Sequence, residues 1–159
     1  MTLRSLTPLL LVAVLFNVSC GSAPDISSFP GLSERVRQYY EFEKKGDWAA
    51  AYEFRTSDFR KSVLKERYIA QMQRDSSGWQ FVDYRIKSVT EAAGRVKLQM
   101  VFTEIPPKGF LPSPQLKGKE FGPMEFEDES IWVQESNNWY SPAAGARVHL
   151  SLNSELVIR

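Results

Sequence analysis

The chain has 159 residues, and its 20 Lys and Arg residues nearly balance 19 Asp and Glu residues. Such a charge balance argues against electrostatic capture of nucleic acid, so we expect no nucleic-acid partner. A single cysteine excludes an intrachain disulfide and a site built from several thiolates, so the hydrophobic core has to stabilise the fold.

The amino terminus carries a short apolar segment. Residues Leu9 to Phe16 are all apolar and follow Arg4, the order of charge and then apolar residues that is typical of a secretory signal peptide. Eight residues of helix span about 12 Å, whereas the hydrocarbon core of a bilayer is ~30 Å thick. The sequence therefore predicts a signal peptide over residues 1–19 and no transmembrane anchor in this segment.

The residues that end this segment resemble the lipobox of bacterial lipoproteins. The small residues Val18 and Ser19 precede Cys20. In a lipobox, a dedicated peptidase cuts before a cysteine that carries a diacylglyceryl group. The resemblance implies that a lipidated Cys20 anchors the protein on the outer side of the cytoplasmic membrane or in the outer membrane. Asn17 stands where the lipobox usually has leucine, and ordinary cleavage after Gly21 is the alternative.

A tether and three helices are predicted next. Residues 20–31 are rich in Ser, Pro and Gly and favour a flexible tether. The first helix begins at an N-cap formed by Ser33 and stops at Gly46. Asp47 caps a second, short helix with the sequence WAAAYEF, and a third helix is predicted from about Ser62 to Arg74.

The hydrophobic period then changes from about 3.6 to 2, which indicates strands. Two antiparallel strands are predicted over residues 82–87 and 96–103. The segment 104–122 contains four prolines and three glycines, which is typical of a long loop. A third strand is expected from Met124 to about Gln134, and a fourth begins at Trp139.

Helices followed by a meandering sheet predict the α+β class. The order resembles that of the NTF2-like (cystatin-like cone) superfamily, through the stretches KKGDW and AAAYEF and the hairpin IWVQESNNWYS, over most of residues 32–142. The resemblance implies N-terminal helices packed on a curved, mostly antiparallel sheet, in a single domain over residues 32–159. It implies hardly any function, because this fold serves unrelated activities.

The stretch MEFEDESIW, residues 124–132, places acidic residues on both faces of the third strand. Period 2 predicts these inward-facing residues: Phe126, Asp128, Ser130 and Trp132. It predicts these outward-facing residues: Glu125, Glu127 and Glu129. The outer glutamates are expected to pair with cations of the preceding strands, Arg85, Lys87, Arg95 or Lys97. A bulge that exposes Asp128 is the alternative.

An inward carboxylate is costly unless it is paired or hydrated, which makes Asp128 a candidate. In the NTF2-like superfamily the cone often holds a ligand, and some members are isomerases or dehydratases that use a pocket Asp, Tyr or His. That resemblance implies Tyr84, Asp128 and Ser130 as candidate ligand-binding residues. The alternative is a structural hydrogen bond at Asp128. No catalytic motif of the family aligns with this chain, so we predict no catalytic residue and no cofactor.

Three further features have two interpretations each. His149, the only histidine, is expected to be an ordinary edge-strand residue, and no metal site is predicted. Phe110 and Leu111 lie in the long loop beside lysines, as a partner surface or a surface for anionic headgroups would require; alternatively, they cover the open end of the cone. One set of aromatic residues is expected to belong to the core, with a ligand cage as the alternative: Tyr39, Tyr40, Trp48, Tyr52, Trp79 and Trp139.

The leader, the tether and the loop together predict a membrane-anchored envelope lipoprotein with a non-enzymatic interaction domain. Its expected partners are the membrane, through the lipid, and an envelope protein. A small apolar ligand in the cone is the alternative function. An acid–base enzyme of the isomerase or dehydratase type, using Asp128 and Tyr84, is the third.

Overall fold

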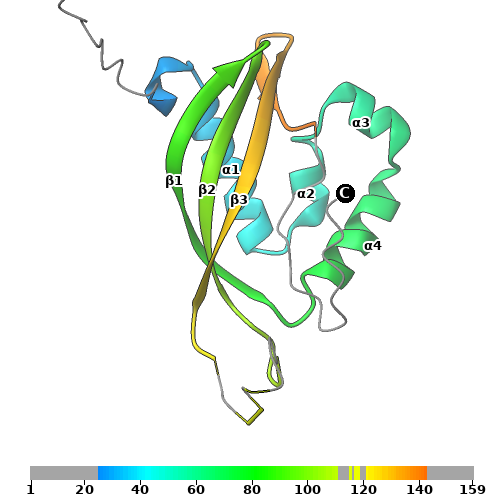
Figure 1. Ribbon diagram of the computed structural model, residues 1–159. Helices are drawn as coiled ribbons and strands as arrows, with labels where there is room; N and C mark the ends of the chain where they lie inside the picture. Colours follow the sequence, from blue (N-terminus) through cyan, green and yellow to red (C-terminus); the bar gives the residue numbers. More distant parts are fainter. Residues whose placement is uncertain (1–24, 111–114, 116, 119–120, 143–159) are drawn as a thin grey trace, which may run out of the picture.

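Helices precede a four-stranded antiparallel sheet in the part of the chain that the structure, a computed structural model, describes: residues 25–110, 115, 117–118 and 121–142 (Figure 1). The helical elements are the 3₁₀-helix η1 (Ile26–Ser28) and the α-helices α1 (Leu32–Lys44), α2 (Trp48–Tyr52), α3 (Ser57–Ser62) and α4 (Lys65–Asp75). The strands are β1 (Gln80–Ala92), β2 (Arg95–Ile105), β3 (Met124–Glu135) and β4 (Asn138–Tyr140).

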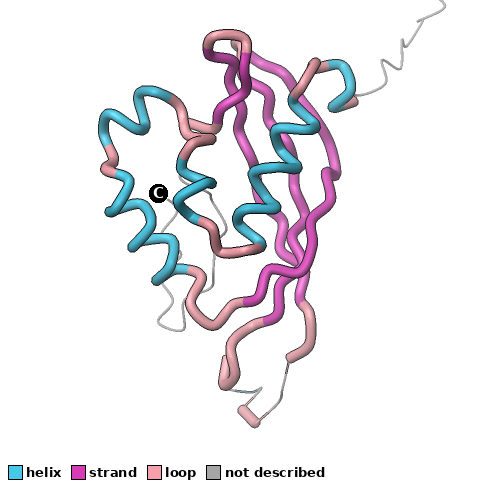
Figure 2. The backbone as a smooth tube through the Cα atoms, turned by 180° about the vertical axis from the view of Figure 1, so that it is seen from behind, coloured by secondary structure: helices cyan, strands magenta, loops and turns pink. Residues whose placement is uncertain are grey.

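The sheet has the order β1-β2-β3-β4, and each strand pairs antiparallel with the next. Figure 2 shows the helices on one side of the curved sheet. Helix α1 lies nearest the sheet and α2 packs beside α1, while α4 packs on α2. The predicted α+β class is confirmed, and the arrangement is the one that the NTF2-like resemblance implied.

The first two helices begin in different ways. Gly31, with φ +78°, precedes α1 without a side-chain cap, so Ser33 lies inside the first turn and the predicted cap at Ser33 is wrong. Glycine takes this left-handed conformation at little cost, and it turns the chain into the helix two residues earlier than predicted. The predicted cap of α2 is confirmed, because the Asp47 carboxylate accepts a hydrogen bond from the Ala50 N–H at 3.0 Å.

The predicted third helix, from about Ser62 to Arg74, corresponds to α4, which begins three residues later, whereas α3 precedes the predicted range and was missed. Thr56 caps α3, and its hydroxyl accepts a hydrogen bond from the Phe59 N–H at 3.3 Å. Val63 then takes an extended conformation with φ −125° and ψ 114°, which ends α3. A β-branched residue is well suited to extended backbone. The helical spacing of Leu64, Tyr68 and Met72 indicated α4, although Leu64 is its N-cap residue and lies outside the helix.

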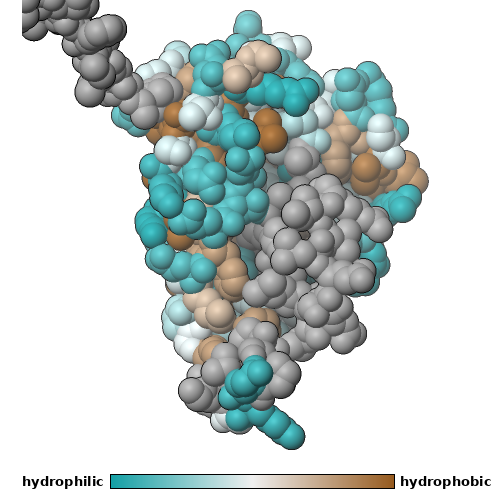
Figure 3. Space-filling view, viewed as in Figure 1, coloured by the Kyte–Doolittle hydropathy of each residue, from teal (hydrophilic) through white to brown (hydrophobic). Residues whose placement is uncertain are grey.

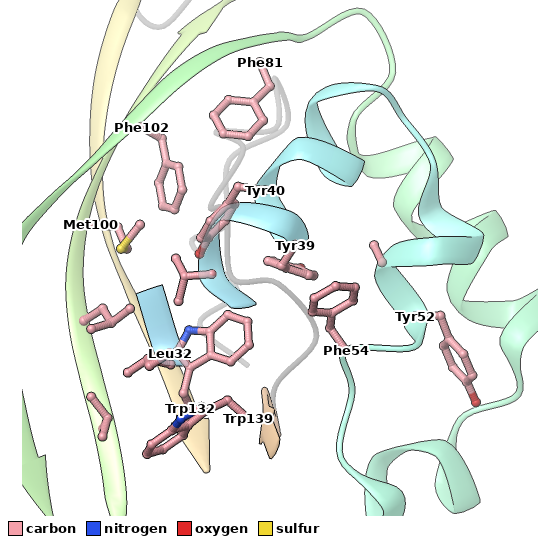
Figure 4. Close-up of a cluster of buried hydrophobic side chains, with 14 of the residues drawn as sticks. Leu32, Tyr39, Tyr40, Tyr52, Phe54, Phe81, Met100, Phe102, Trp132 and Trp139 are labelled. Carbon is pink, nitrogen blue, oxygen red and sulfur yellow. The ribbon is translucent and has the colours of Figure 1, made fainter. Parts of the chain in front are cut away.

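The core lies between α1 and the inner face of the sheet. Helix α1 contributes Leu32, Val36, Tyr39 and Tyr40, which recur at helical spacing and are all buried. The sheet contributes buried residues at alternating positions, including Leu98, Met100, Phe102 and Trp132. Figure 4 shows side chains from both layers meeting in this space.

The folded body begins before α1. Ile26 and Phe29 pack against the core, and the Phe29 ring meets Trp139 edge-on with 6.2 Å between the ring centroids. The Trp139 indole N–H donates a hydrogen bond to the Pro30 carbonyl at 2.9 Å. The final residues of the predicted tether therefore pack on the domain. Residues 1–24, with Cys20, and residues 143–159, with His149, lie outside the described residues.

Candidate functional site

The two faces of β3 differ as the sequence predicts, and no register shift interrupts the pairing of β2 with β3. On the outer face the three glutamates form cross-strand ion pairs: Arg85–Glu125 at 3.0 Å, Lys87–Glu127 at 2.7 Å and Lys97–Glu129 at 3.1 Å. We call these three pairs the outer ladder. All six side chains are about half exposed, and hydrophilic residues dominate this side of the sheet (Figure 3).

The inner face of β3 carries Asp128 and Ser130. Asp128 is half-buried, and its Oδ1 accepts a hydrogen bond from the Glu129 N–H at 2.7 Å. Burial raises the pKa of the Asp128 carboxyl from 3.8 to about 6, and that hydrogen bond only partly offsets the effect. Ser130 is buried, and its hydroxyl accepts a hydrogen bond from the Trp132 indole N–H at 2.9 Å.

The third candidate, Tyr84, lies on β1. Its ring packs against Tyr40 of α1 with 4.8 Å between the centroids, and partial burial raises the pKa of its hydroxyl. In the register Tyr84 faces Phe102, whereas Asp128 faces Met100, so strand β2 separates the two residues. Two strand spacings amount to roughly 10 Å. The three candidates share one face of the sheet but are not brought into contact as an acid–base pair.

Aromatic side chains fill the space between α1 and the sheet. The Tyr40 ring lies 5.3 Å from the Phe102 ring and 6.2 Å from the Phe81 ring, measured between centroids. Tyr39 meets Trp132 edge-on at 5.8 Å. Figure 4 shows these rings between the two layers. The described part of the cone is therefore a packed core.

A pocket opens at the lower end of the helical layer in Figure 1, where α1 and α4 end and where α2 and β1 begin. Its volume is about 230 Å³. Its lining consists of Glu43, Lys44, Lys45, Gly46, Trp48, Ser76, Trp79, Gln80 and Phe81. Trp48 and Trp79 belong to the aromatic set of the sequence analysis, whereas the end of α1 carried no signal for a site.

Phe110 is buried, with 4% of its surface exposed. Its ring meets Trp79 at 5.1 Å and Phe121 at 5.9 Å, and Trp79 also meets Phe126 at 5.6 Å. Phe110 thus packs at this end of the sheet, as the covering interpretation expects, and its side chain is not an exposed anchor for a partner. Leu111 lies outside the described residues.

A buried polar cluster, which the sequence analysis missed, lies behind the pocket. The Arg55 guanidinium has no exposed surface, and it donates hydrogen bonds to the hydroxyls of Tyr68 at 2.9 Å, Ser141 at 3.1 Å and Tyr39. Its Nη2 lies 4.0 Å from Glu43 Oε1. We call these five residues the Arg55 cluster. An isolated arginine between Phe54 and Thr56 has no periodicity that would predict such burial.

Glu43 connects the Arg55 cluster to the pocket, because it belongs to both. The Tyr39 hydroxyl donates a hydrogen bond to Glu43 Oε1. Burial raises the pKa of the Tyr39 hydroxyl well above its usual value, so this hydroxyl keeps the proton that it donates. The side chain of Glu43 is therefore fixed from behind by Tyr39 and Arg55.

Two further properties bear on function. In the part of the chain that the structure describes, no three His, Cys, Asp or Glu residues gather as ligands for a metal ion. A search of the same residues finds no helix with the length and apolar character needed to cross a bilayer.

Neither a protein-family model nor a curated protein matches this chain. The chain is similar in structure to a SEC-C motif containing protein from Rhodopseudomonas palustris, with a TM-score of 0.52, 12% identity, and coverage of 71% of this chain and 76% of that chain. It is also compared with a proposed NTF2-like transpeptidase from Campylobacter jejuni, with a TM-score of 0.44, 10% identity, and coverage of 70% and 96%. The first likeness shows a shared fold only.

Proposed function

We propose that this protein is a lipid-anchored binding module of the bacterial envelope and that its folded domain is not an enzyme. The observation that carries the proposal is the leader itself, an apolar run that ends at the only cysteine of the chain, Cys20. Acylation of Cys20 as the first residue of the mature chain would explain why the only cysteine stands at this position. The signal peptide and the lipid would place the domain outside the cytoplasmic membrane.

The short distance between Cys20 and the folded body supports a role close to the membrane. Five residues separate Cys20 from Ile26, which packs on the core. Fully extended, such a segment reaches less than ~20 Å. A domain held at this distance would meet envelope components near the surface of the lipid layer, such as glycans and membrane-bound proteins.

The geometry of the polar residues supports binding over catalysis. Tyr84 and Asp128 lie on strands that β2 separates, so neither is placed to transfer a proton to the other. A general acid and its base have to converge on one reacting group within hydrogen-bond reach. The packed space between α1 and the sheet gives no support to an apolar ligand there, and the pocket beside Trp48 and Trp79 offers a candidate binding site outside that core.

Metabolic labelling with a radioactive fatty acid tests the anchor. The wild-type chain should become labelled and should partition into the detergent phase after extraction. Cys20→Ala should abolish the label, and Ser22→Ala, two residues further on, should retain it as the matched control. A wild-type chain that stays unlabelled, with the mature product free in the medium, would overturn the proposal.

A further inference from the structure

The pocket combines flat aromatic walls with a polar rim. Trp48, Trp79 and Phe81 form the apolar part of the lining; Trp48 and Phe81 are buried, and Trp79 is only partly buried. Lys44, Lys45 and Gln80 are exposed residues of the same lining. Ligand sites of this type use ring faces for contact area and a few polar groups for orientation. An apolar ligand would leave the polar rim without partners, so the ligand has to present both kinds of surface.

The charges of the lining argue against a simple ion as the ligand. The carboxylate of Glu43 is buried and already accepts the hydrogen bond from Tyr39, with Arg55 close by. A cation would meet the ammonium groups of Lys44 and Lys45, which are exposed at the rim. An anion would be attracted by these ammonium groups but would also meet the carbonyl ends of two helices, because α1 and α4 both end here. A neutral ligand avoids both conflicts.

We propose that this pocket binds one ring of a neutral sugar. A pyranose ring has an apolar face of C–H groups, which suits the partly exposed indole ring of Trp79. Its hydroxyls both donate and accept hydrogen bonds, so they suit a rim that offers the Gln80 amide, the Ser76 hydroxyl and the lysine ammonium groups. This inference rests on the proposed function, because sugars are abundant components of the envelope that the lipid anchor would face.

The size of the pocket limits the ligand to a single ring. Its volume of about 230 Å³ is below the ~300 Å³ at which pockets for drug-sized molecules begin. A longer glycan would therefore place one ring against Trp79 and extend along the surface.

The walls of the pocket are held in place before any ligand arrives. Trp79 packs on Phe110 and Phe126. Gly78, with φ +79°, turns the chain into β1 so close to Pro107 that a Cβ at residue 78 would lie 2.7 Å from the Pro107 Cβ. A rigid site loses less conformational entropy on binding than a mobile one.

The lining predicts binding of a sugar without hydrolysis. Glycoside hydrolysis by the common mechanisms requires two carboxyl groups on opposite sides of the scissile bond. In the described lining Glu43 is the only acidic residue, and it is already engaged by Tyr39. The pocket is thus suited to holding a glycan near the membrane.

Tryptophan fluorescence of the full mature chain tests this proposal, with N-acetylglucosamine and glucose as neutral probes and tetramethylammonium and inorganic phosphate as charged probes. We expect a saturable change with at least one sugar at about millimolar concentration, within the range of weak specific binding, and none with either ion. Gln80→Ala should weaken sugar binding by about two- to tenfold, because it removes one hydrogen-bonding group from the rim. Gln99→Ala, on the outer face of the sheet, is the matched control and should bind as the wild type does.

Trp79→Phe keeps an aromatic ring against Phe110 but removes most of the indole face, so it should weaken sugar binding while the far-UV circular dichroism spectrum stays that of the folded chain. A tetramer of N-acetylglucosamine that binds more tightly than the monosaccharide would indicate a polymeric ligand over a free sugar. Binding of tetramethylammonium or phosphate in place of the sugars, or no response to either sugar, would overturn the proposal. Fatty-acid labelling is independent of this experiment, so a labelled chain that binds no sugar refutes only the sugar site.

Discussion

The outer ladder and the Arg55 cluster are built from the same kinds of charged residue in opposite surroundings. In the outer ladder each ion pair joins two side chains that are about half exposed, such as Lys87 and Glu127. In the Arg55 cluster the guanidinium and Glu43 are almost completely excluded from water. Exposed pairs contribute little because water screens them and competes for both partners. A buried charge is costly to leave without its partners.

The two groups also differ in what they connect. The outer ladder stays within one sheet: Lys97–Glu129 joins the neighbouring strands β2 and β3, and the other two pairs reach from β1 to β3 across β2. The Arg55 cluster joins Tyr39 of α1, Tyr68 of α4 and Ser141, which follows β4. Backbone hydrogen bonds reinforce the last connection, since the Ser141 N–H donates to the Phe54 carbonyl at 2.8 Å. The difference teaches that position, more than charge, decides which polar residues hold distant parts of this fold together.

Replacement of Arg55 tests the Arg55 cluster, for which we expect the larger effect on stability. Arg55→Met is expected to lower the free energy of unfolding by about 3 to 5 kcal/mol, because it leaves Glu43 buried without its cation. Urea denaturation followed by far-UV circular dichroism measures the loss. Arg60→Met is the matched control, since the Arg60–Glu53 pair is partly exposed and should contribute less than about 1 kcal/mol.

The double variant Arg55→Met with Glu43→Leu separates the lost cation from the lost packing. It removes both charges, so it should be more stable than the sum of the two single variants predicts. An Arg55→Met chain as stable as the wild type would show that the cluster does not secure these elements.

Asp128 lies between the two extremes, because it is half-buried. Its pKa of about 6 in the folded chain is above the ordinary 3.8, so the ionised form is disfavoured by folding. The stability of the fold should accordingly decrease as pH rises from about 4 through 6. For a fully buried group, a pKa shift of this size would lower the free energy of unfolding by roughly 3 kcal/mol once the group is ionised. Because Asp128 is partly exposed to solvent, we expect a loss of about 1.5 kcal/mol.

Asp128→Asn removes this charge and should therefore stabilise the protein by about 1.5 kcal/mol at pH 8 and hardly change it at pH 3.5. Unfolding curves at the two pH values measure the difference. The exposed residue Glu129 provides the control, since Glu129→Gln should produce no comparable gain at pH 8. A less stable Asp128→Asn chain at pH 8 would mean that the carboxylate has a stabilising partner.

The outer ladder was predictable because it depends on local pattern alone. Period 2 along 124–132 assigned Glu125, Glu127 and Glu129 to one face, and an uninterrupted register preserved that assignment. The Arg55 cluster was not predictable, because its members come together only when α1, α4 and the end of β4 pack. The pocket depends on the same long-range packing, since residues at the end of α1, the start of α2, the end of α4 and the start of β1 line it.

Helix boundaries show the same limit at a smaller scale. The cap at Asp47 was predictable because it depends only on neighbouring residues: its carboxylate accepts a hydrogen bond from the N–H of a residue three positions away. Asp47→Ala should cost about 1 kcal/mol, since it leaves the Ala50 N–H at the start of α2 to water. Thermal unfolding measures the change, and Asp47→Asn, which retains an acceptor oxygen, should recover most of it. No difference between the alanine and asparagine variants would show that this hydrogen bond does not stabilise α2.

The smallest expected effect concerns the charges of the outer ladder. Val101 stands between Arg85 and Glu127 in the register and is only 3% exposed although it lies on the outer face. Long charged side chains can cover apolar neighbours with their methylene stems while their charges stay in water. The main contribution of the ladder would then be the shielding of Val101, with the ion pairs adding a few tenths of a kcal/mol each.

Two substitutions of Glu127 separate stem from charge. Glu127→Gln keeps the stem and removes the charge, so it should change the free energy of unfolding by less than about 0.5 kcal/mol, an effect that 1 M salt should abolish. Glu127→Ala also removes the stem and exposes Val101, so its cost should be larger and should persist in 1 M salt. Equal costs for the two variants that both vanish in salt would show that the charge, and not the shielding of Val101, is what the outer ladder contributes.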